Sequence, residues 1–421
     1  MNPRLAAFNA LTAVTRGGAY TSLALKEHIP SDMPAESKRF AAALVRTTLE
    51  NLLKIDYALD AFIKSARVHG SVRNILRLGA CQIMFMGTKD YAAVNESALL
   101  AKSLKPQTSG FVNAVLRALI NGLGGIVYPS GRNAKYLSIE YSYPEWICEK
   151  YVADFGFDFT EKLLSYKAPL STSVRMNALK THAAEFESSL AKARLSFSRG
   201  SVEDSYAVEG MSDIENMREF KGGLFAVQSE SSMRAVLAAG IKKGDRLLDC
   251  CAAPGGKSAY AAALTDNGIE ITAWDVHEHR VEMTKKNFSR LGVKNARVSL
   301  RDASVYAPEF EGGFDVVMID APCSSMGLMA KNPDIRYSAR QQDITALSEK
   351  QRAIISACGR YVKPQGTLAY FTCSLNKEEN ELITDGFIEG GFGFEYVSKQ
   401  TLFPHICGSD GFYIAVMRRK K

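Results

Sequence analysis

From about residue 225 onwards, short apolar runs alternate with amphipathic segments, and this alternation restricts the possible folds more than any other feature of the chain. Strands that alternate with helices form a parallel sheet with helices on both faces. The last part of the chain is therefore predicted to be a doubly wound, Rossmann-like α/β domain. We expect helices at 257–264 and 277–291, and strands at 246–249, 269–275, 297–300, 314–320, 367–373 and 412–417.

The first third of the chain has a different pattern. From residue 3 to about 123 the apolar residues recur at helical spacing, as at Leu5, Phe8 and Leu11, and no strand-like alternation interrupts them. Glycines and prolines between residues 122 and 132 mark its end. Between the two regions we expect a small α/β connector, with strands at 173–177 and 206–208 and a helix at 183–193. The predicted domains are therefore 1–135, 136–224 and 225–421.

Positive charge is concentrated in the helical region. Residues 1–140 contain 17 lysines and arginines against 9 acidic residues, whereas the remainder contains 35 against 36. A basic domain joined to a neutral one suits a polyanion such as nucleic acid, because phosphate contacts release condensed counterions. A solvated helical surface explains the same surplus equally well, so charge alone does not choose between them.

The eight cysteines are scattered through the chain without CxxC spacing, and the six histidines are dispersed. Neither a disulfide scaffold nor a metal site is indicated, so we expect nucleophilic cysteine chemistry in a reducing compartment, the cytoplasm. No apolar run approaches the roughly 18–20 residues that a membrane span needs, and the N-terminus lacks the apolar core of a secretory signal. We expect a monomer that does not associate with membranes.

Ligands of doubly wound sheets bind beyond the carboxyl ends of the strands, so the residues that end each strand are candidates for a site. A glycine turn alone is often structural, but three later strands end near Asp275, Asp302 and Asp320. Carboxylates can accept hydrogen bonds from ribose hydroxyls and from an adenine amino group. Three of them at strand ends therefore favour a nucleoside-containing cofactor over a coincidental placement. The first strand ends in the candidate cofactor loop, Cys251-Ala252-Ala253-Pro254-Gly255-Gly256-Lys257, which follows Asp249-Cys250.

Two cysteines also follow predicted strands. Cys323 comes after the strand that ends at Asp320, and Cys373 comes at the end of the next one. A lone cysteine near a strand end is usually a small buried apolar residue, but two at one edge suit methylation of cytosine at carbon 5. That carbon becomes nucleophilic only when a thiolate adds to carbon 6, and a second group then assists elimination. Either cysteine could be the nucleophile. Asp320 could hydrogen-bond the ring, and Lys257 could lower the thiolate pKa.

These motifs resemble the NOL1/NOP2/Sun family of RNA cytosine-5 methyltransferases. The resemblance spans residues 225–421 and implies S-adenosylmethionine as cofactor, bound by residues 251–257 with Asp275, Asp302 and Asp320. In that family the cysteine of the T-C-S motif attacks carbon 6 and the cysteine of P-C-S assists release, which implies Cys373 and Cys323 in these roles. The motifs are Cys250 to Lys257, Asp320-Ala321-Pro322-Cys323-Ser324, Pro333-Asp334-Ile335-Arg336, Thr372-Cys373-Ser374, Glu378-Glu379-Asn380 and Asp410-Gly411-Phe412-Tyr413.

The N-terminal region resembles the helical RNA-binding domain of NusB, chiefly at residues 46–49 and 110–117. This fusion implies the branch that acts on bacterial 16S ribosomal RNA, as free RNA or in an assembly intermediate. Transfer RNA, another ribosomal RNA site, and a non-catalytic NusB-like RNA-binding factor stay open as alternatives. One departure is Gln228-Ser229-Glu230, where the family more usually has a glutamine–aspartate pair.

Overall fold

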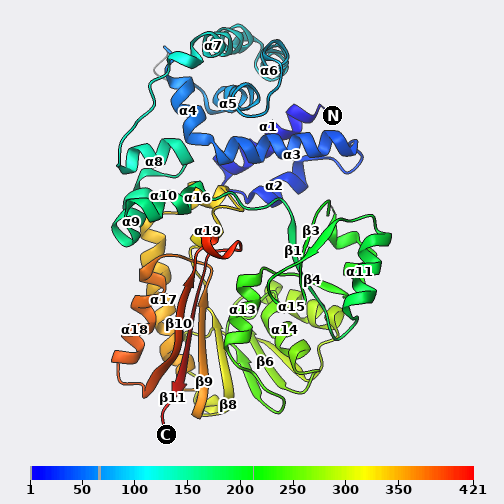
Figure 1. The fold of residues 1–421 in the computed structure, drawn as a ribbon, viewed down its shortest axis with the longest axis vertical. Coiled ribbons are helices and arrows are strands. Elements are labelled where there is room, and N and C mark those ends of the chain that lie inside the picture. Colours follow the sequence, from blue (N-terminus) through cyan, green and yellow to red (C-terminus); the bar gives the residue numbers. More distant parts are fainter. Residues whose placement is uncertain (1, 65–67, 212) are drawn as a thin grey trace. The chain divides into compact units, whose positions relative to one another are not determined.

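The computed structural model describes residues 2–64, 68–211 and 213–421 (Figure 1). Contacts divide the chain into two compact units. The N-terminal unit comprises residues up to Tyr166 together with Asn332–Ala339, and the C-terminal unit comprises Lys167–Lys331 and Arg340–Lys421. The three-part division expected from the sequence stays a prediction. Among the described residues, no helix has both the length and the apolar character needed to cross a membrane.

The N-terminal unit is helical in its described residues, and the apolar spacing predicts this for residues 3–123. Its first helix shows why: Asn2 accepts from the amide of Arg4 as N-cap, Pro3 occupies the first turn, and Gly18 ends the helix in the left-handed conformation. Inward-facing side chains between Ala7 and Leu119 form one apolar core. The helices are α1 (Pro3–Gly17), α2 (Thr21–His28), α3 (Ala35–Glu50), α4 (Leu52–Asp60), α5 (Gly70–Met84), α6 (Asp90–Leu104), η1 (Pro106–Thr108), α7 (Ser109–Gly122), η2 (Leu123–Gly125), α8 (Ala134–Tyr141), α9 (Glu145–Phe155), α10 (Phe157–Ser165) and α16 (Asp334–Ser338).

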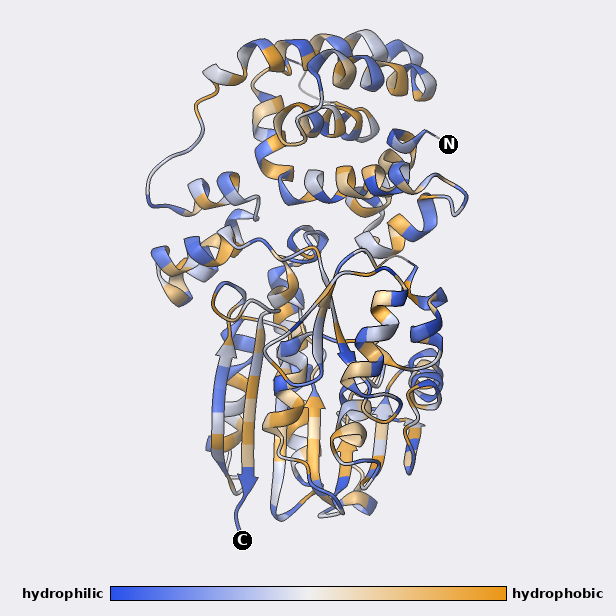
Figure 2. Cartoon of the chain, turned by 45° about the vertical axis from the view of Figure 1, so that its right-hand side comes forward, coloured by the Kyte–Doolittle hydropathy of each residue, from blue (hydrophilic) through white to orange (hydrophobic). Residues whose placement is uncertain are grey.

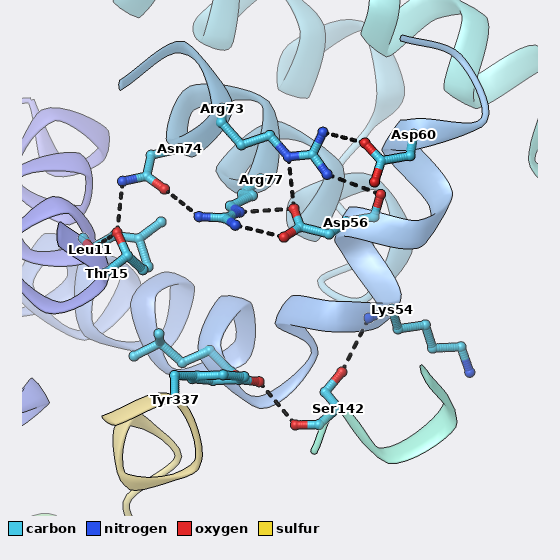
Figure 3. A network of polar contacts seen from close by, with 11 residues as sticks. Leu11, Thr15, Lys54, Asp56, Asp60, Arg73, Asn74, Arg77, Ser142 and Tyr337 are labelled. Carbon is cyan, nitrogen blue, oxygen red and sulfur yellow. Dashed lines mark hydrogen bonds and ion pairs between the residues drawn. The ribbon is translucent and has the colours of Figure 1, made fainter. Parts of the chain in front are cut away.

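A polar network joins α4, α5 and α1 beside this core (Figure 3). Arg77 contacts both carboxylate oxygens of Asp56, at 2.8 and 2.6 Å, and Arg73 contacts Asp56 at 2.9 Å. Asn74 accepts from Arg77 and donates to Thr15 of α1. The arginine and aspartate side chains therefore have hydrogen-bond partners in one another. This pairing offsets the cost of burying part of their charge between the helices.

Residues 332–339, which follow the motif around Cys323 in sequence, belong by their contacts to the N-terminal unit. Asp334 accepts from Thr21 at 2.8 Å, and Tyr337 donates to the carbonyl of Leu49. Tyr337 also donates to the carbonyl of Ser142 (Figure 3). Arg336 is buried, donates to the carbonyl of Glu50, and lies 3.9 Å from the centre of the Tyr143 ring. The motif Pro333-Asp334-Ile335-Arg336 is thus built into the helical unit.

The C-terminal unit begins with a small antiparallel sheet in the order β2-β3-β1-β4. The sequence predicts β1, β3 and α11, but the three-residue strands β2 and β4 are too short to give a pattern. Phe186 and Leu190 of α11 pack on this sheet with Val174 and Phe225. The elements are β1 (Thr172–Met176), α11 (Ala183–Lys192), β2 (Phe197–Arg199), β3 (Ser205–Val208), η3 (Ile214–Asn216), α12 (Arg218–Lys221) and β4 (Phe225–Val227).

A seven-stranded mixed sheet in the order β10-β11-β9-β8-β5-β6-β7 forms the rest of the unit. Strands β5 to β9 are parallel, and β11 pairs antiparallel with β9 and β10. The sequence predicts the parallel strands, the helices α14 and α15, and β11; β10 was not predicted, because this strand is mostly polar and half exposed. The elements are α13 (Glu230–Ala238), β5 (Arg246–Asp249), α14 (Gly256–Leu264), β6 (Glu270–Asp275), α15 (Glu278–Leu291), β7 (Ala296–Leu300), η4 (Pro308–Phe310), β8 (Phe314–Asp320), η5 (Met326–Leu328), α17 (Gln341–Gly359), β9 (Val362–Thr372), η6 (Lys377–Glu379), α18 (Glu381–Glu389), β10 (Phe394–Leu402), α19 (Pro404–Cys407) and β11 (Phe412–Arg419).

Each face of the sheet has its own apolar core, because successive side chains of a strand point to opposite faces. Leu247 of β5 belongs to the core covered by α13, α14 and α15. Leu248, its neighbour, belongs to the core covered by α17 and α18. Figure 2 shows the hydrophobic residues gathered on the strands and on the helix surfaces that face them. Since both faces are covered, the residues at the strand ends are the ones that remain available for chemistry.

Candidate active site

The candidate cofactor loop connects β5 to α14. Gly255 has φ +92° and precedes the first turn of α14. A Cβ atom there would lie 2.8 Å from the Phe288 ring and 3.0 Å from the Thr284 methyl group of α15. Only glycine satisfies both the left-handed conformation and this close approach. The loop therefore presents backbone amides, at the start of a helix, to whatever binds at this end of the sheet.

Carboxylates lie at the ends of the neighbouring strands. Asp275 ends β6, is nearly buried, and accepts from the amide of His277 at 3.1 Å. Asp302 follows β7, and its pKa is lowered by hydrogen bonds from the hydroxyl and amide of Ser304. These acceptors, with the loop amides, make a donor and acceptor set that fits the ribose and base of a nucleoside. Burial raises the pKa of Asp249, which ends β5, to about 6 although Ser258 donates to it.

Asp320 and Lys257 form an ion pair at the ends of β8 and α14, with Nζ 2.5 Å from Oδ2. Burial lowers the pKa of Lys257, but the adjacent Asp320 carboxylate outweighs burial and the net shift is upward. Lys257 is therefore a fixed positive charge at neutral pH. Both side chains remain partly exposed, so the pair can contact a substrate.

The two cysteines lie in contact. Strands β8 and β9 pair in parallel, with Asp320 opposite Phe371, so Cys323 and Cys373 follow neighbouring strand ends as the sequence predicts. Their sulfur atoms are 3.2 Å apart, and both residues are free thiols with partial exposure. The structure thus brings together the four residues proposed for catalysis, Lys257, Asp320, Cys323 and Cys373, at one edge of the sheet.

The surroundings of the two sulfurs differ. The pKa of Cys373 is lowered because Cys323 donates to it, burial opposes this shift, and Ser325 and Lys257 reinforce it. The pKa of Cys323 is raised well above its usual value by the same hydrogen bond and by burial. The charge distribution therefore favours a thiolate at Cys373 and a thiol at Cys323. This asymmetry is a property of the folded chain that the sequence could not provide, and the roles of the two cysteines stay a prediction.

The loop with Cys323 is held by close backbone contacts. The amide of Gly327 donates to the carbonyl of Cys373 at 2.8 Å, and its own carbonyl accepts from the amide of Gly411. A Cβ atom on Gly327 would lie 2.2 Å from the Gly411 carbonyl oxygen. The Asp410-Gly411 segment at the start of β11 therefore fixes the loop against the end of β9.

Several polar residues of this site are not among the catalytic or cofactor-binding residues that the sequence predicts. Glu379 is buried and accepts from Ser324 and Ser374, the residues directly after the two cysteines. Asn380 donates to the carbonyl of Ser374. Both belong to the motif Glu378-Glu379-Asn380, for which the family resemblance implies no role. In the sequence these two residues lie in a polar run that follows a buried strand. Such a run is also typical of an exposed turn, so the sequence alone does not mark them as site residues.

The departure at Gln228-Ser229-Glu230 has a local structural explanation. Ser229 is the N-cap of α13 and accepts from the amide of Ser232. Glu230 accepts from the hydroxyls of Ser201 and Ser205 and from the amide of Ser201. These residues therefore stabilise the start of α13 and its contact with the small sheet.

Among residues 2–64, 68–211 and 213–421, no group of three or more histidine, cysteine, aspartate or glutamate side chains could hold a metal ion.

Ser325 offers a first test of the asymmetry between the cysteines. It lies in the left-handed conformation, φ +58°, with its hydroxyl 3.4 Å from the Cys373 sulfur. Ser325→Gly suits that backbone and removes a donor to the thiolate, so the pKa of Cys373 should rise. On the expectation that the Cys373 thiolate is the nucleophile, the rising limb of the pH–kcat/KM profile should move upward by about one pH unit. Ser142→Gly, at another left-handed serine, is the control; an unchanged profile for Ser325→Gly contradicts the assignment.

Known proteins resemble the chain over its whole length. The family model described as "16S rRNA methyltransferase RsmB/F" matches residues 236–418, and the NusB family model matches residues 1–121. The "Probable ribosomal RNA small subunit methyltransferase B" of Bacillus subtilis (strain 168) is 32% identical over 441 residues, covering 98% of each chain. The structure described as "Crystal Structure of PH0851" is 25% identical, with a TM-score of 0.82 over 100% of this chain and 99% of the other. NSun6 from Pyrococcus horikoshii, solved with SFG, shares the fold at 21% identity and a TM-score of 0.58, over 65% of this chain and 97% of its own.

Proposed function

Because the chain belongs to the RsmB/F family of RNA cytosine methyltransferases with an N-terminal NusB domain, we propose that it methylates carbon 5 of a cytosine in 16S ribosomal RNA through a covalent adduct with Cys373. The single observation that carries the mechanism is the contact of the two sulfurs beside the Lys257–Asp320 pair. Relatives of this chain whose names refer to the ribosomal small subunit support 16S ribosomal RNA as the substrate. So does the surplus of basic residues in positions 1–140.

S-adenosylmethionine is the cofactor, and it supplies a methyl group on a sulfonium sulfur. The residues that would hold it are the loop of residues 251–257, Asp275 and Asp302. Asp320 ends the next strand and lies between this loop and the cysteines. The donor set fits, since carboxylates can accept from ribose hydroxyls and from an adenine amino group.

The reaction begins at Cys373. Its thiolate adds to carbon 6 of the cytosine, while Asp320 hydrogen-bonds the polar edge of the ring and Lys257 keeps Asp320 in place. Addition makes carbon 5 nucleophilic, because the ring becomes an enamine. After methylation, carbon 5 carries a methyl group and a proton, and the proton leaves to a base before the carbon–sulfur bond breaks. The thiol of Cys323 is placed to donate to the departing sulfur, 3.2 Å away.

The target cytosine must be outside a base stack. Carbon 6 has to meet Cys373 while carbon 5 meets a methyl donor, and a stacked base cannot be approached in this way. We propose that the enzyme acts on free 16S RNA or an assembly intermediate, in the cytoplasm, where thiols stay reduced.

The test uses the purified chain with labelled S-adenosylmethionine and four substrates: naked 16S RNA, assembled small subunits, 23S RNA and transfer RNA. Bisulfite sequencing then locates the product. We expect 5-methylcytosine at a discrete position of naked 16S RNA. Methylation of transfer RNA or 23S RNA in place of 16S RNA would contradict the proposed substrate. Methylation of assembled subunits alone would contradict action on free RNA or an assembly intermediate.

A further inference from the structure

Glu379 is a fully buried carboxylate to which the mechanism above gives no role. It lies in η6, after β9, and receives donors from both cysteine loops. One oxygen accepts from the amide of Ser324 at 2.7 Å, and the other accepts from the hydroxyls of Ser324 and Ser374, each at 2.5 Å. Asn376 also donates to it, at 2.8 Å. A buried charge with this many donors is held in one geometry.

The two loops depend on Glu379 to different extents. The loop with Cys373 has anchors of its own, because Thr372 is paired within the sheet, and Ser374 accepts from Asn380 through its carbonyl at 3.0 Å. The loop with Cys323 is joined to the end of β9 by backbone hydrogen bonds at Ala321 and Gly327, on either side of the sulfur. Pro322 accepts from Gln351 at 2.8 Å on one side, and on the other side Ser324 directs both its amide and its hydroxyl to Glu379.

We propose that Glu379 is a positioning residue that holds the Cys323 loop against the Cys373 loop and thereby governs release of the methylated product. This inference rests on the proposed function, since it takes Cys373 as nucleophile and Cys323 as donor to the departing sulfur. Glu379 acts through Ser324 on the neighbouring Cys323. Its loss should therefore affect the step that needs both sulfurs and leave addition of Cys373 to carbon 6 largely intact.

Glu379→Gln tests the inference, because the amide keeps the shape but turns a donor toward the serine and asparagine donors. In single-turnover reactions with 16S RNA, at a pH high enough to ionise Cys373 in both proteins, adduct formation should stay within about twofold of the wild-type rate. Adduct decay should slow about 10- to 100-fold, the cost of a small misplacement of a reacting group. Glu379→Asp, which keeps the charge with a shorter reach, should restore part of the decay rate. Glu389→Gln, at an exposed glutamate of α18, is the matched control.

Ser324→Ala is the second variant, and it removes one link between the Cys323 loop and Glu379 without altering the carboxylate. Ser324→Ala should also slow adduct decay. The role of Glu379 can therefore be tested even if Glu379→Gln does not fold. Equal slowing of formation and decay, or wild-type decay in a folded variant, overturns the role of Glu379. The Cys323→Ala protein is run alongside: if it accumulates no adduct, the proposed mechanism fails on its own account, whatever Glu379→Gln does.

Discussion

The Cys373→Ala protein is expected to lose methyl transfer by about 10⁴-fold or more, the scale seen when a covalent nucleophile is removed. The reason is chemical: carbon 5 of cytosine is a poor nucleophile until a thiolate adds to carbon 6, and alanine cannot add. Binding of the cofactor should persist, because the loop of residues 251–257 and Asp275 remain in place. Single-turnover transfer of labelled methyl groups to 16S RNA measures the rate, and equilibrium binding of S-adenosylmethionine measures the affinity.

Cys407→Ala is the control for that experiment, since Cys407 is also a partly exposed free thiol but lies in α19. It should retain the wild-type rate. Methyl transfer by Cys373→Ala at a rate close to wild type would contradict the assignment of the nucleophile. A parallel loss in both variants would indicate damage to the fold in place of a chemical effect.

The sequence predicts the position of those site residues that directly follow a parallel strand. Asp320 and Cys373 could be placed at one edge because each follows an apolar run and because parallel strands end on the same side of a sheet. The pairing of β8 with β9 confirms that expectation. The fold class was predictable for the same reason, since helical and strand periodicities leave direct traces in the order of apolar residues.

Other parts of the site depend on contacts between residues distant in the chain. Glu379 lies 55 positions from Ser324, and a glutamate in a polar run gives no sign that it will be buried. Outside the site, Arg336 packs among helices of the N-terminal unit although it follows Cys323 in sequence. The pKa difference between the two sulfurs likewise arises from their mutual hydrogen bond, reinforced by Ser325 and Lys257, and these contacts with Cys373 form only in the folded chain.

Cys323→Ala is expected to have the opposite phenotype to Cys373→Ala: a covalent protein–RNA adduct that accumulates, because addition and methylation proceed but the departing sulfur loses its donor. The adduct should survive denaturing electrophoresis, and its decay should be at least about 100-fold slower than in the wild-type protein. Addition itself does not require Cys323, since Lys257 and Ser325 still favour the Cys373 thiolate, although its pKa rises when the hydrogen bond from Cys323 is lost.

The methyl content of that adduct decides at which step Cys323 acts. If its thiol assists only the departure of Cys373, the trapped RNA should carry close to one labelled methyl group per adduct. An adduct without label would place Cys323 before methyl transfer, and an adduct in the Cys373→Ala protein, with none in Cys323→Ala, would reverse the two roles. The double variant should form no adduct. Cys358→Ala, at a thiol buried on the opposite side of the sheet from α14, should behave as wild type.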